Sequence, residues 1–422
     1  MNTLKELKTF IILWLTQTLS SLGSSMTGFA LVIWLYNDSG SALTTALLTV
    51  CSYAPYVIVS IFAGAISDKW NKKAVMLVCD SFAALTTVCV LVLLKTGSLE
   101  VWHLYILNAL NGLMNSVQSP ASDVATTLLT PEKHYQKTSA MRYFSNSLVS
   151  ILTPVLATAI VSFAGLDAVI AFDLATFSVA FTVLLFFIKI PEAPQNENGK
   201  ETLLRSAKSG ISYLGRNKGI LCMILFLSAI NFIASIYNAA LPALILSKGN
   251  EAALGAVSSS AGIATLIGSV IATFVPKPKS RSKTICACLI VSMSTENFLL
   301  AFGNNTIAWC IGAVLGWLFI PLMSANYDVI FRSTVPKEML GRVYSVRNTL
   351  QFFSIPVGYF LGGFLVDKVF EPFMAGTKNA LLLNIFGTEK GSGAAFLFFV
   401  IGIAGVIVCA VFSRIRALRE LG

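Results

Sequence analysis

The sequence predicts an all-α membrane protein in which twelve transmembrane helices form two pseudo-symmetric six-helix bundles. Apolar residues occupy 55% of the 422 positions and charged residues only 12%, and the mean hydropathy is +0.76. A soluble protein of this length needs far more charge to cover its surface. Twelve spans of about 20 apolar residues each would use nearly all of the apolar positions. The composition therefore excludes a chain of soluble domains.

Twelve apolar runs, separated by Gly, Pro, Asn and charged residues, divide the chain. Each run is long enough for a helix that crosses about 30 Å of hydrocarbon. Helices are expected because they satisfy the backbone hydrogen bonds that lipid cannot satisfy. The predicted spans are residues 9–36, 43–66, 74–95, 101–129, 139–164, 168–188, 219–246, 253–275, 284–303, 306–331, 343–367 and 393–413.

The basic residues predict the orientation of these spans. With both termini in the cytoplasm, 25 of the 30 Lys and Arg residues fall in cytoplasmic segments, as the positive-inside rule requires. The net charge of +10 then reflects basic loops that meet an anionic lipid leaflet, and no nucleic-acid partner is expected. We predict a multi-pass protein of the plasma membrane with both termini cytoplasmic.

A repeated triplet relates the two halves of the chain. The triplet Asp123, Pro131, Arg142 recurs 205 residues later as Asp328, Pro336, Arg347. Both copies lie at the end of one predicted span, in the next loop and at the start of the following span. The repeat predicts an N-terminal bundle at 1–190 and a C-terminal bundle at 219–422. In transporters with such repeats the substrate site lies between the halves.

The segment between the bundles, residues 191–218, is predicted to be a cytoplasmic linker. Its first part, from Glu192 to Lys200, is polar. The residues that follow have apolar positions at helical spacing, with Arg and Lys between them, from Leu203 to Leu214. This spacing predicts a short amphipathic helix on the membrane surface; a plain linker is the alternative.

Polar side chains form a stripe in each of three predicted spans. Steps of three, four and three residues keep each stripe on one helix face. The stripes are Gln17, Ser20, Ser24 and Thr27 in the first span, Asn108, Asn111, Asn115 and Gln118 in the fourth, and Ser228, Asn231, Ser235 and Asn238 in the seventh. Amides in a bilayer need partners or water, so the stripes predict a shared polar cavity. The alternative is that they hydrogen-bond packed helices together.

The tenth predicted span adds a more aromatic wall to this cavity, with Trp317, Ser324 and Tyr327. Amides, hydroxyls and aromatic rings suit a bulky amphiphile that carries many oxygen acceptors better than they suit a small ion. The predicted substrate-contacting residues are Gln17, Ser24, Asn108, Asn111, Asn115, Gln118, Asn231, Ser235, Asn238, Trp317 and Tyr327.

The loop between the second and third predicted spans carries a motif that runs Gly64-Ala-Ile-Ser-Asp68-Lys69-Trp-Asn-Lys72-Lys73. Its glycine permits close helix approach. Asp68 can face the N-terminus of a neighbouring helix, a contact worth about 0.3–1 kcal/mol. The motif resembles the G-x-x-x-D-[RK]-x-x-[RK]-[RK] signature of the major facilitator superfamily. The resemblance implies a gate contact that helps to hold the outward-facing state; a solvated turn is the alternative.

Further segments resemble the macrolide-efflux branch of that family, whose members export antibiotics and whose relatives export siderophores. They are Gln118-Ser-Pro-Ala-Ser-Asp123, Gly341-Arg342-Val343 and the stretch from Pro356-Val-Gly358 to Gly362-Gly-Phe-Leu-Val-Asp367. The chain departs from the family's pattern at Thr153-Pro154-Val-Leu-Ala, where antiporters usually carry a Gly-Pro-x-x-Gly type of motif. The second-half loop Lys277-Pro-Lys279-Ser-Arg281 also lacks the acidic residue of the motif.

Five carboxyl groups fall inside predicted spans, and an intramembrane carboxylate is a functional hypothesis by default. They are Asp80, Asp123, Asp173, Glu296 and Asp328. Asp123 with Arg142, and Asp328 with Arg347, lie near the cytoplasmic ends of consecutive helices and are predicted to pair as gate latches, with proton carriage as the alternative. Asp80 and Glu296 have no cation nearby in the sequence and are the predicted proton carriers. Asp173 is expected near the outer surface.

These observations predict a proton antiporter that exports a bulky amphiphile of the macrolide type by alternating access. A siderophore or a lipid-like metabolite is the alternative substrate. No phosphate-binding loop or hydrolase motif is present, so an ion gradient is the expected energy source. We expect a monomer without enzymatic activity, cofactor or metal, since the eight cysteines form no CxxC pair. A lipid-modifying enzyme and a sensor are the rival classes.

Overall fold

The computed structural model of the chain describes residues 6–131, 134–191, 211–336 and 340–419. Within its helices the side chains are described except at 60–69, 135–136, 139–140, 143, 332, 340–342, 344–345 and 419. Nearly all of the described chain is helical. Residues 203–210 of the predicted amphipathic helix lie outside the described residues, whereas 211–216 are helical.

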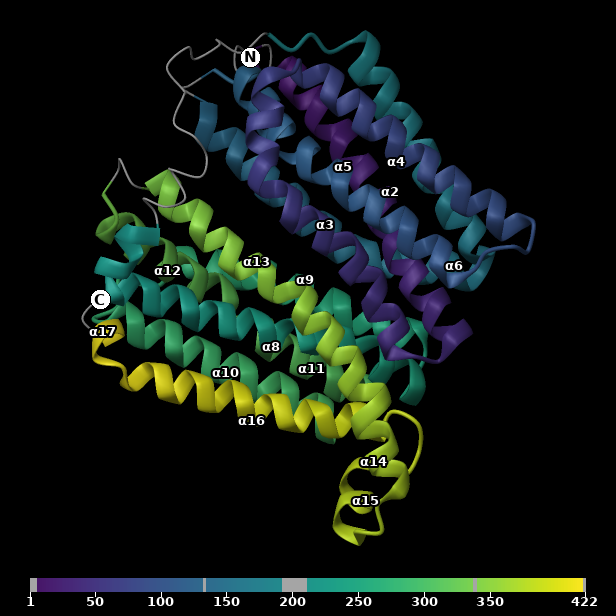
Figure 1. The fold of residues 1–422 in the computed structure, drawn as a ribbon, viewed down its shortest axis with the longest axis vertical. Helices are drawn as coiled ribbons and strands as arrows, with labels where there is room; N and C mark the ends of the chain where they lie inside the picture. Colours follow the sequence, from purple (N-terminus) through teal and green to yellow (C-terminus); the bar gives the residue numbers. More distant parts are fainter. Residues whose placement is uncertain (1–5, 132–133, 192–210, 337–339, 420–422) are drawn as a thin grey trace. The chain divides into compact units, whose positions relative to one another are not determined.

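The chain divides into two compact units. Unit 1 comprises Met1–Leu35 and Cys51–Lys200, and unit 2 comprises Tyr36–Val50 and Glu201–Gly422. The helices that lie wholly or mostly in unit 1 are α2 (Lys8–Ser39), α3 (Ala42–Lys69), α4 (Lys72–Lys95), α5 (Val101–Leu128) and α6 (Tyr135–Phe186) (Figure 1). Those of unit 2 are α8 (Lys218–Lys248), α9 (Glu251–Phe274), α10 (Arg281–Phe302), α11 (Thr306–Trp317), α12 (Ile320–Thr334), α13 (Leu340–Phe364), η3 (Leu365–Phe370), α14 (Glu371–Gly376), α15 (Ala380–Phe386), α16 (Ser392–Arg414) and α17 (Arg416–Arg419).

Ten stretches of the described residues are long and apolar enough to cross a membrane. One of them, Phe144–Phe186, covers two predicted spans, because α6 continues through Gly165, whose φ of 79° and ψ of 176° interrupt the helix. The predicted span 101–129 forms α5 but is not among the ten, since its four amides lower its hydropathy. The twelve predicted spans are thus all helical, and the predicted all-α, multi-span fold is confirmed.

Two predicted spans differ in detail from the helices that form. The run 306–331 is divided into α11 and α12, and Pro321 lies in the first turn of α12, where its missing N–H costs no helix hydrogen bond. The eleventh span continues past its predicted end through the π-helix η3 and through α14 to Gly376. The loop that follows contains the short helix α15.

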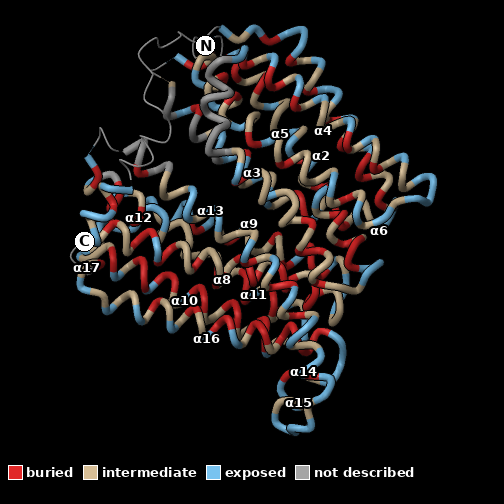
Figure 2. The backbone as a smooth tube through the Cα atoms, viewed as in Figure 1, coloured by how far each residue is buried: buried red, intermediate tan, exposed pale blue. Residues whose placement is uncertain are grey.

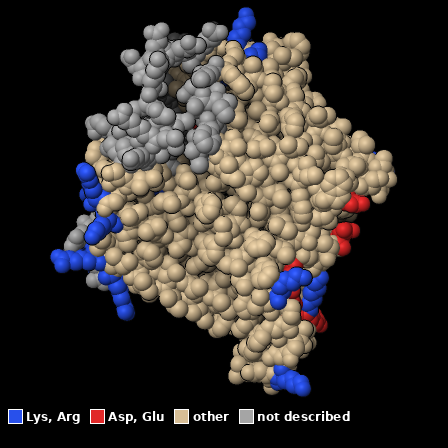
Figure 3. Space-filling view, viewed as in Figure 1, with Lys and Arg blue, Asp and Glu red and all other residues tan. Residues whose placement is uncertain are grey.

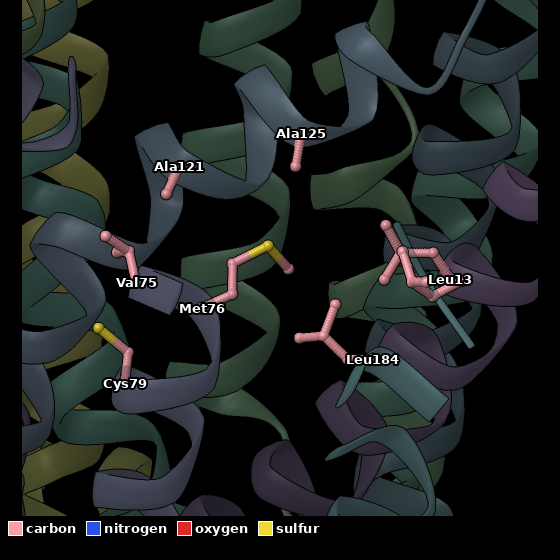
Figure 4. Close-up of a cluster of buried hydrophobic side chains, with 8 residues drawn as sticks. Leu13, Val75, Met76, Cys79, Ala121, Ala125 and Leu184 are labelled. Carbon is pink, nitrogen blue, oxygen red and sulfur yellow. The ribbon is translucent and has the colours of Figure 1, made fainter. Parts of the chain in front are cut away.

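A buried apolar cluster joins four helices of unit 1 close to the motif loop. Its members are Leu13, Val75, Met76, Cys79, Ala121, Ala125, Leu184 and Ile188. Figure 4 shows the Met76 side chain in the middle of the cluster, with Ala121 and Ala125 on the neighbouring helix. These alanines are four residues apart and share one face of α5, so their small side chains let α5 lie close to α4. The cluster holds the first turn of α4, and therefore Lys72 and Lys73, in place.

In unit 2 the helix α8 packs against α13 and α16, and α10 packs against α11 and α16. Figure 2 shows buried residues concentrated along α8 and α10 and exposed residues over α14 and α15. In Figure 3 the Lys and Arg side chains of this unit gather near α17 and again near α14, with a broad uncharged surface over α10 and α16 between them. An uncharged band of this kind suits contact with lipid.

The segment Tyr36–Val50 contains the turn between α2 and α3. Polar contacts before and after this turn hold the segment in unit 2. The Tyr36 hydroxyl donates to the carbonyl oxygen of Ala243 (3.1 Å). Asp367, in the π-helix η3, accepts hydrogen bonds from the backbone N–H groups of Ala42 (3.0 Å) and Leu43 (2.8 Å) and from the Ser41 hydroxyl. Because the first N–H groups of a helix have no partner within it, Asp367 acts as the cap of α3.

Replacing Asp367 by alanine is expected to destabilise the protein by about 1–2 kcal/mol, because two backbone donors at the start of α3 lose their acceptor. The measurement is thermal unfolding of the purified protein in detergent. Asp38→Ala is the matched control, since Asp38 is exposed in the same turn region. An equal melting temperature for both variants would show that the cap contributes nothing.

Candidate functional site

A cavity of about 580 Å³ lies inside unit 1. All eight residues of the first- and fourth-span stripes line it, and so do side chains from α3, α4 and α6. The stripe residues are Gln17, Ser20, Ser24, Thr27, Asn108, Asn111, Asn115 and Gln118. The two helices α2 and α5 therefore turn their polar faces toward the same space. The walls also carry the carboxyl groups of Asp80, Asp123 and Asp173.

The amide side chains of α5 line the cavity and also make hydrogen bonds within the protein. Asn108 donates to the Leu104 carbonyl oxygen on its own helix (2.9 Å), and Asn111 accepts a hydrogen bond from the Thr86 hydroxyl on α4 (3.0 Å). Gln118 donates to a carboxyl oxygen of Asp80. The stripe thus combines the two alternatives of the sequence analysis, since its side chains line a cavity and also link helices.

Asp80, one of the two predicted proton carriers, lies on α4 at the cavity wall. Besides its hydrogen bond from Gln118, its carboxyl group lies beside the side chain of Gln17 on α2. The amide nitrogen of Gln17 is buried and makes no hydrogen bond of normal geometry to a described residue. Both neighbours of Asp80 are neutral amides.

Asp173 is a buried residue at the wall of the cavity. It is only 4% exposed, and its expected place near the outer surface of the membrane stays a prediction. The Ser24 hydroxyl donates to it (2.9 Å), and Gly23 of α2 lies directly against its backbone. A signal for this burial exists in the sequence, because Asp173, Thr176 and Ala180 share one helix face, and all three are buried.

The predicted pair of Asp123 and Arg142 forms an ion pair at the margin of the cavity. Both side chains are about half exposed, so the pair contributes only about 0–1 kcal/mol to stability. A weak pair of this kind can open and close at little cost. Its role as a gate latch stays a prediction.

Glu296, the other predicted proton carrier, is enclosed within unit 2. It is 5% exposed and accepts hydrogen bonds from the Tyr237 hydroxyl (2.6 Å) and the Trp317 indole N–H (2.9 Å). Gly316 lies directly against the carboxyl group, where a larger residue would collide with it. Trp317, predicted to be a cavity wall, is thus a donor to Glu296.

The stripe of the seventh span has different surroundings from the other two. Ser228, Ser235 and Asn238 on α8 donate to carbonyl oxygens of their own helix, at 2.9, 2.7 and 2.8 Å. Gly358 of α13 packs directly against Ser235. Asn231 is half-buried on the same helix. The hydrogen bonds given for this stripe stay within α8 and do not link helices, so its contact with substrate stays a prediction.

Arg347, the predicted partner of Asp328, lies over two aromatic rings. Its guanidinium carbon is 5.7 Å from the ring centre of Tyr327 and 5.4 Å from that of Phe331, and it donates to the side-chain oxygen of Asn348 (3.0 Å). Tyr327 also accepts a hydrogen bond from Gln351 (3.4 Å). Asp328 is half-buried nearby on α12, and its pairing with Arg347 stays a prediction.

The motif loop is described only in part, since the side chains of Gly64, Asp68 and Lys69 lie outside the described residues. Lys72 donates to the Trp70 carbonyl oxygen (3.2 Å). Lys73 donates to the carbonyl oxygens of Leu185 (2.9 Å) and Ile188 (2.8 Å) at the C-terminal end of α6. A cation stabilises the free carbonyl groups at such a helix end, so Lys73 ties the motif loop to α6.

Comparison with known proteins places these features in a family. The model of the Major Facilitator Superfamily matches residues 13–359. The chain is 23% identical over 415 residues to Macrolide efflux protein A of Streptococcus pyogenes, covering 97% of each chain. It is 21% identical over 376 residues to Multidrug efflux pump Tap of Mycolicibacterium fortuitum, covering 86% of this chain and 91% of the relative.

Among solved structures, a mutant of the nucleoside transporter NupG has the same fold. Its TM-score is 0.73 at 14% sequence identity, with coverage of 95% of this chain and 99% of that chain. The matched family model spans most of the chain, and the resemblance inferred from the motif loop is confirmed. The chain therefore belongs to the major facilitator superfamily.

Proposed function

We propose that this secondary transporter exports a bulky amphiphilic compound of the macrolide type from the cell in exchange for protons. The observation that carries the proposal is the cavity of unit 1, whose volume of about 580 Å³ lies in the range of small-molecule sites. Its walls combine amides, hydroxyls and carboxyl groups with a few apolar residues. A relative that covers 97% of both chains is a macrolide efflux protein, which supports this substrate class.

Two carboxyl groups, one half-buried and one buried, support the proton coupling. Asp80 and Glu296 are each held by neutral donors, from Gln118 and from Tyr237 with Trp317. A carboxyl group without a cationic partner can lose and regain a proton without breaking an ion pair. We propose that at least one of the two carries the exchanged proton, and that the membrane potential adds about 2.3 kcal/mol per charge for each 100 mV.

Alternating access requires gates on the two sides of the membrane. We propose that the motif residues Gly64, Asp68, Lys69, Lys72 and Lys73 form one gate, with the pairs Asp123–Arg142 and Asp328–Arg347 as its latches. The contacts of Lys73 with the end of α6 support this role, because they couple the loop to a neighbouring helix. We further propose that both termini face the cytoplasm, that the chain acts as a monomer, and that residues 1–190 and 219–422 form the two moving halves.

The test is the accumulation of labelled erythromycin in cells that express the protein in the plasma membrane. Export predicts lower accumulation than in vector-only cells, and a protonophore should restore it because it removes the proton gradient. A labelled catecholate siderophore and a labelled phospholipid analogue are measured in parallel. Unchanged erythromycin accumulation at good membrane expression would contradict the macrolide assignment, and lowered accumulation of either other compound would favour the alternative substrate class.

A further inference from the structure

The cavity of unit 1 carries more negative than positive groups. Among the described residues that line it are three with carboxyl groups and one basic residue, Arg142. Arg142 pairs with Asp123, which leaves Asp80 and Asp173 with neutral hydrogen-bond donors, Gln118 and Ser24. Two carboxyl groups at a cavity wall without a cationic partner among the lining residues attract a positively charged ligand.

A second observation concerns two buried donors near these carboxyl groups. The amide nitrogen of Gln17 lies beside Asp80, and the hydroxyl of Thr27 lies beside Asp173. Both atoms are buried and neither makes a hydrogen bond of normal geometry to a described residue; Thr27 is only 7% exposed. Each donor lies beside a carboxyl group that can accept from it, so the neighbours of Asp80 and Asp173 on α2 are neutral.

The helix α2 sets the distance between the two carboxyl sites. Gln17 lies beside Asp80, and Ser24 donates to Asp173. Because Gln17 and Ser24 are seven residues apart on α2, the two carboxyl sites are separated by about 10 Å along the helix axis. A single ammonium group therefore reaches one carboxyl group and not both. The residues between the sites, Ser20 and Ser21, offer hydroxyl groups to the rest of the ligand.

Of the two carboxyl groups, Asp173 is better suited to receive a cation. Its neighbours on α2 are the short hydroxyl side chains of Ser24 and Thr27, which occupy few of the roughly four acceptor positions of a carboxylate. Asp80 lies instead between the longer amide side chains of Gln17 and Gln118. The Asp173 side chain also has little exposure, and weak screening strengthens its attraction for a charge.

We propose that the cavity binds an organic cation that also carries oxygen acceptors, and that Asp173 is the residue that binds its positively charged nitrogen. Ser20, Ser21 and the amide of Asn115, which line the same cavity, would donate to the oxygen atoms. The proposal rests on the proposed function only in taking this cation to be the exported compound. It assigns Asp173 to the cargo and leaves Asp80, like Glu296, as a candidate carrier of the proton.

The test is equilibrium binding of radiolabelled tetraphenylphosphonium to the purified full-length protein in detergent. This probe has a permanent charge, so its own protonation does not change. Asp173→Asn is expected to weaken binding about tenfold or more, and Asp173→Glu to retain most of it. Asp167→Asn is the matched control, because it removes a carboxylate that pairs with Lys95 at an exposed site of the same unit, and it should bind like the wild type.

Ser24→Lys provides a second variant that does not depend on the stability of Asp173→Asn. The ammonium group of the new lysine would form an ion pair with Asp173 and neutralise its charge, which should abolish tetraphenylphosphonium binding. Wild-type affinity in Asp173→Asn or Ser24→Lys, a loss confined to Asp80→Asn, or no saturable binding by the wild type would each overturn the proposal. This assay measures binding without transport, so tetraphenylphosphonium binding can be found even if erythromycin is not exported. Erythromycin export without tetraphenylphosphonium binding would contradict the role of Asp173 and leave the proposed export function standing.

Discussion

Glu296→Gln is expected to abolish proton-coupled export while leaving unit 2 folded. Glutamine keeps the size of the side chain and an oxygen that can accept from Tyr237 and Trp317, as the carboxyl group does. It cannot bind or release a proton in the working pH range. Export driven by an imposed pH gradient should therefore fall about tenfold or more, which corresponds to at least about 1.4 kcal/mol in the rate-limiting step.

The measurement is substrate-dependent proton flux in proteoliposomes that contain a pH-sensitive dye. The matched control is Glu251→Gln, because Glu251 accepts a hydrogen bond from Asn37 at an exposed position of the same unit. Glu296→Ala separates structure from function, since it leaves the Tyr237 and Trp317 donors without an acceptor, at about 1–3 kcal/mol for each. Wild-type proton flux in a well-folded Glu296→Gln protein would exclude Glu296 as the carrier and leave Asp80.

Gly112→Ala is expected to destabilise unit 1 by about 1–3 kcal/mol or to prevent its folding, because it overpacks the contact between α3 and α5. A Cβ atom at Gly112 would collide with the carbonyl oxygen of Ser52 and would lie 2.9 Å from its carbonyl carbon. Backbone atoms in a helix cannot move aside as a flexible side chain does. The two helices would have to separate, and Asn111, which accepts from Thr86, would move with α5.

The measurement is the melting temperature of the purified variant, together with its size-exclusion profile. Gly28→Ala is the matched control, since Gly28 also lies in a helix of unit 1 and has no atom within 4 Å of the added methyl group. Alanine favours the helix there by about 0.5–1 kcal/mol. Equal melting temperatures for Gly112→Ala and Gly28→Ala would contradict the close contact at Ser52.

The helices and their polar faces could be predicted from the sequence because both depend on local periodicity. The stripes of α2 and α5 border one cavity. Asp123 and Arg142 form an ion pair because only a short loop separates the end of α5 from the start of α6. The break between α11 and α12 was not predicted because the residues around it, 317–320, are all apolar. The orientation and the domain boundaries stay predictions.

What covers a polar face could not be predicted in the same way. The stripe of α8 has the same spacing as the other two, yet Ser235 packs against Gly358 of a helix more than a hundred residues away. The burial of Asp173 likewise depends on Gly23, which lets α2 lie against α6. Trp317 has a carboxyl partner in Glu296, and the spacing of aromatic residues does not reveal which polar group a ring nitrogen will bind.

The helix α3 contains a proline close to the place where it passes from one unit to the other. Pro55 lies inside this helix, and because proline has no amide hydrogen, the carbonyl group of Cys51 lacks its usual helical partner. Cys51 is also the first residue of α3 that belongs to unit 1. Asp367 thus satisfies the backbone donors of the first turn of α3, whereas Pro55 leaves one carbonyl group further along the same helix without its helical hydrogen bond.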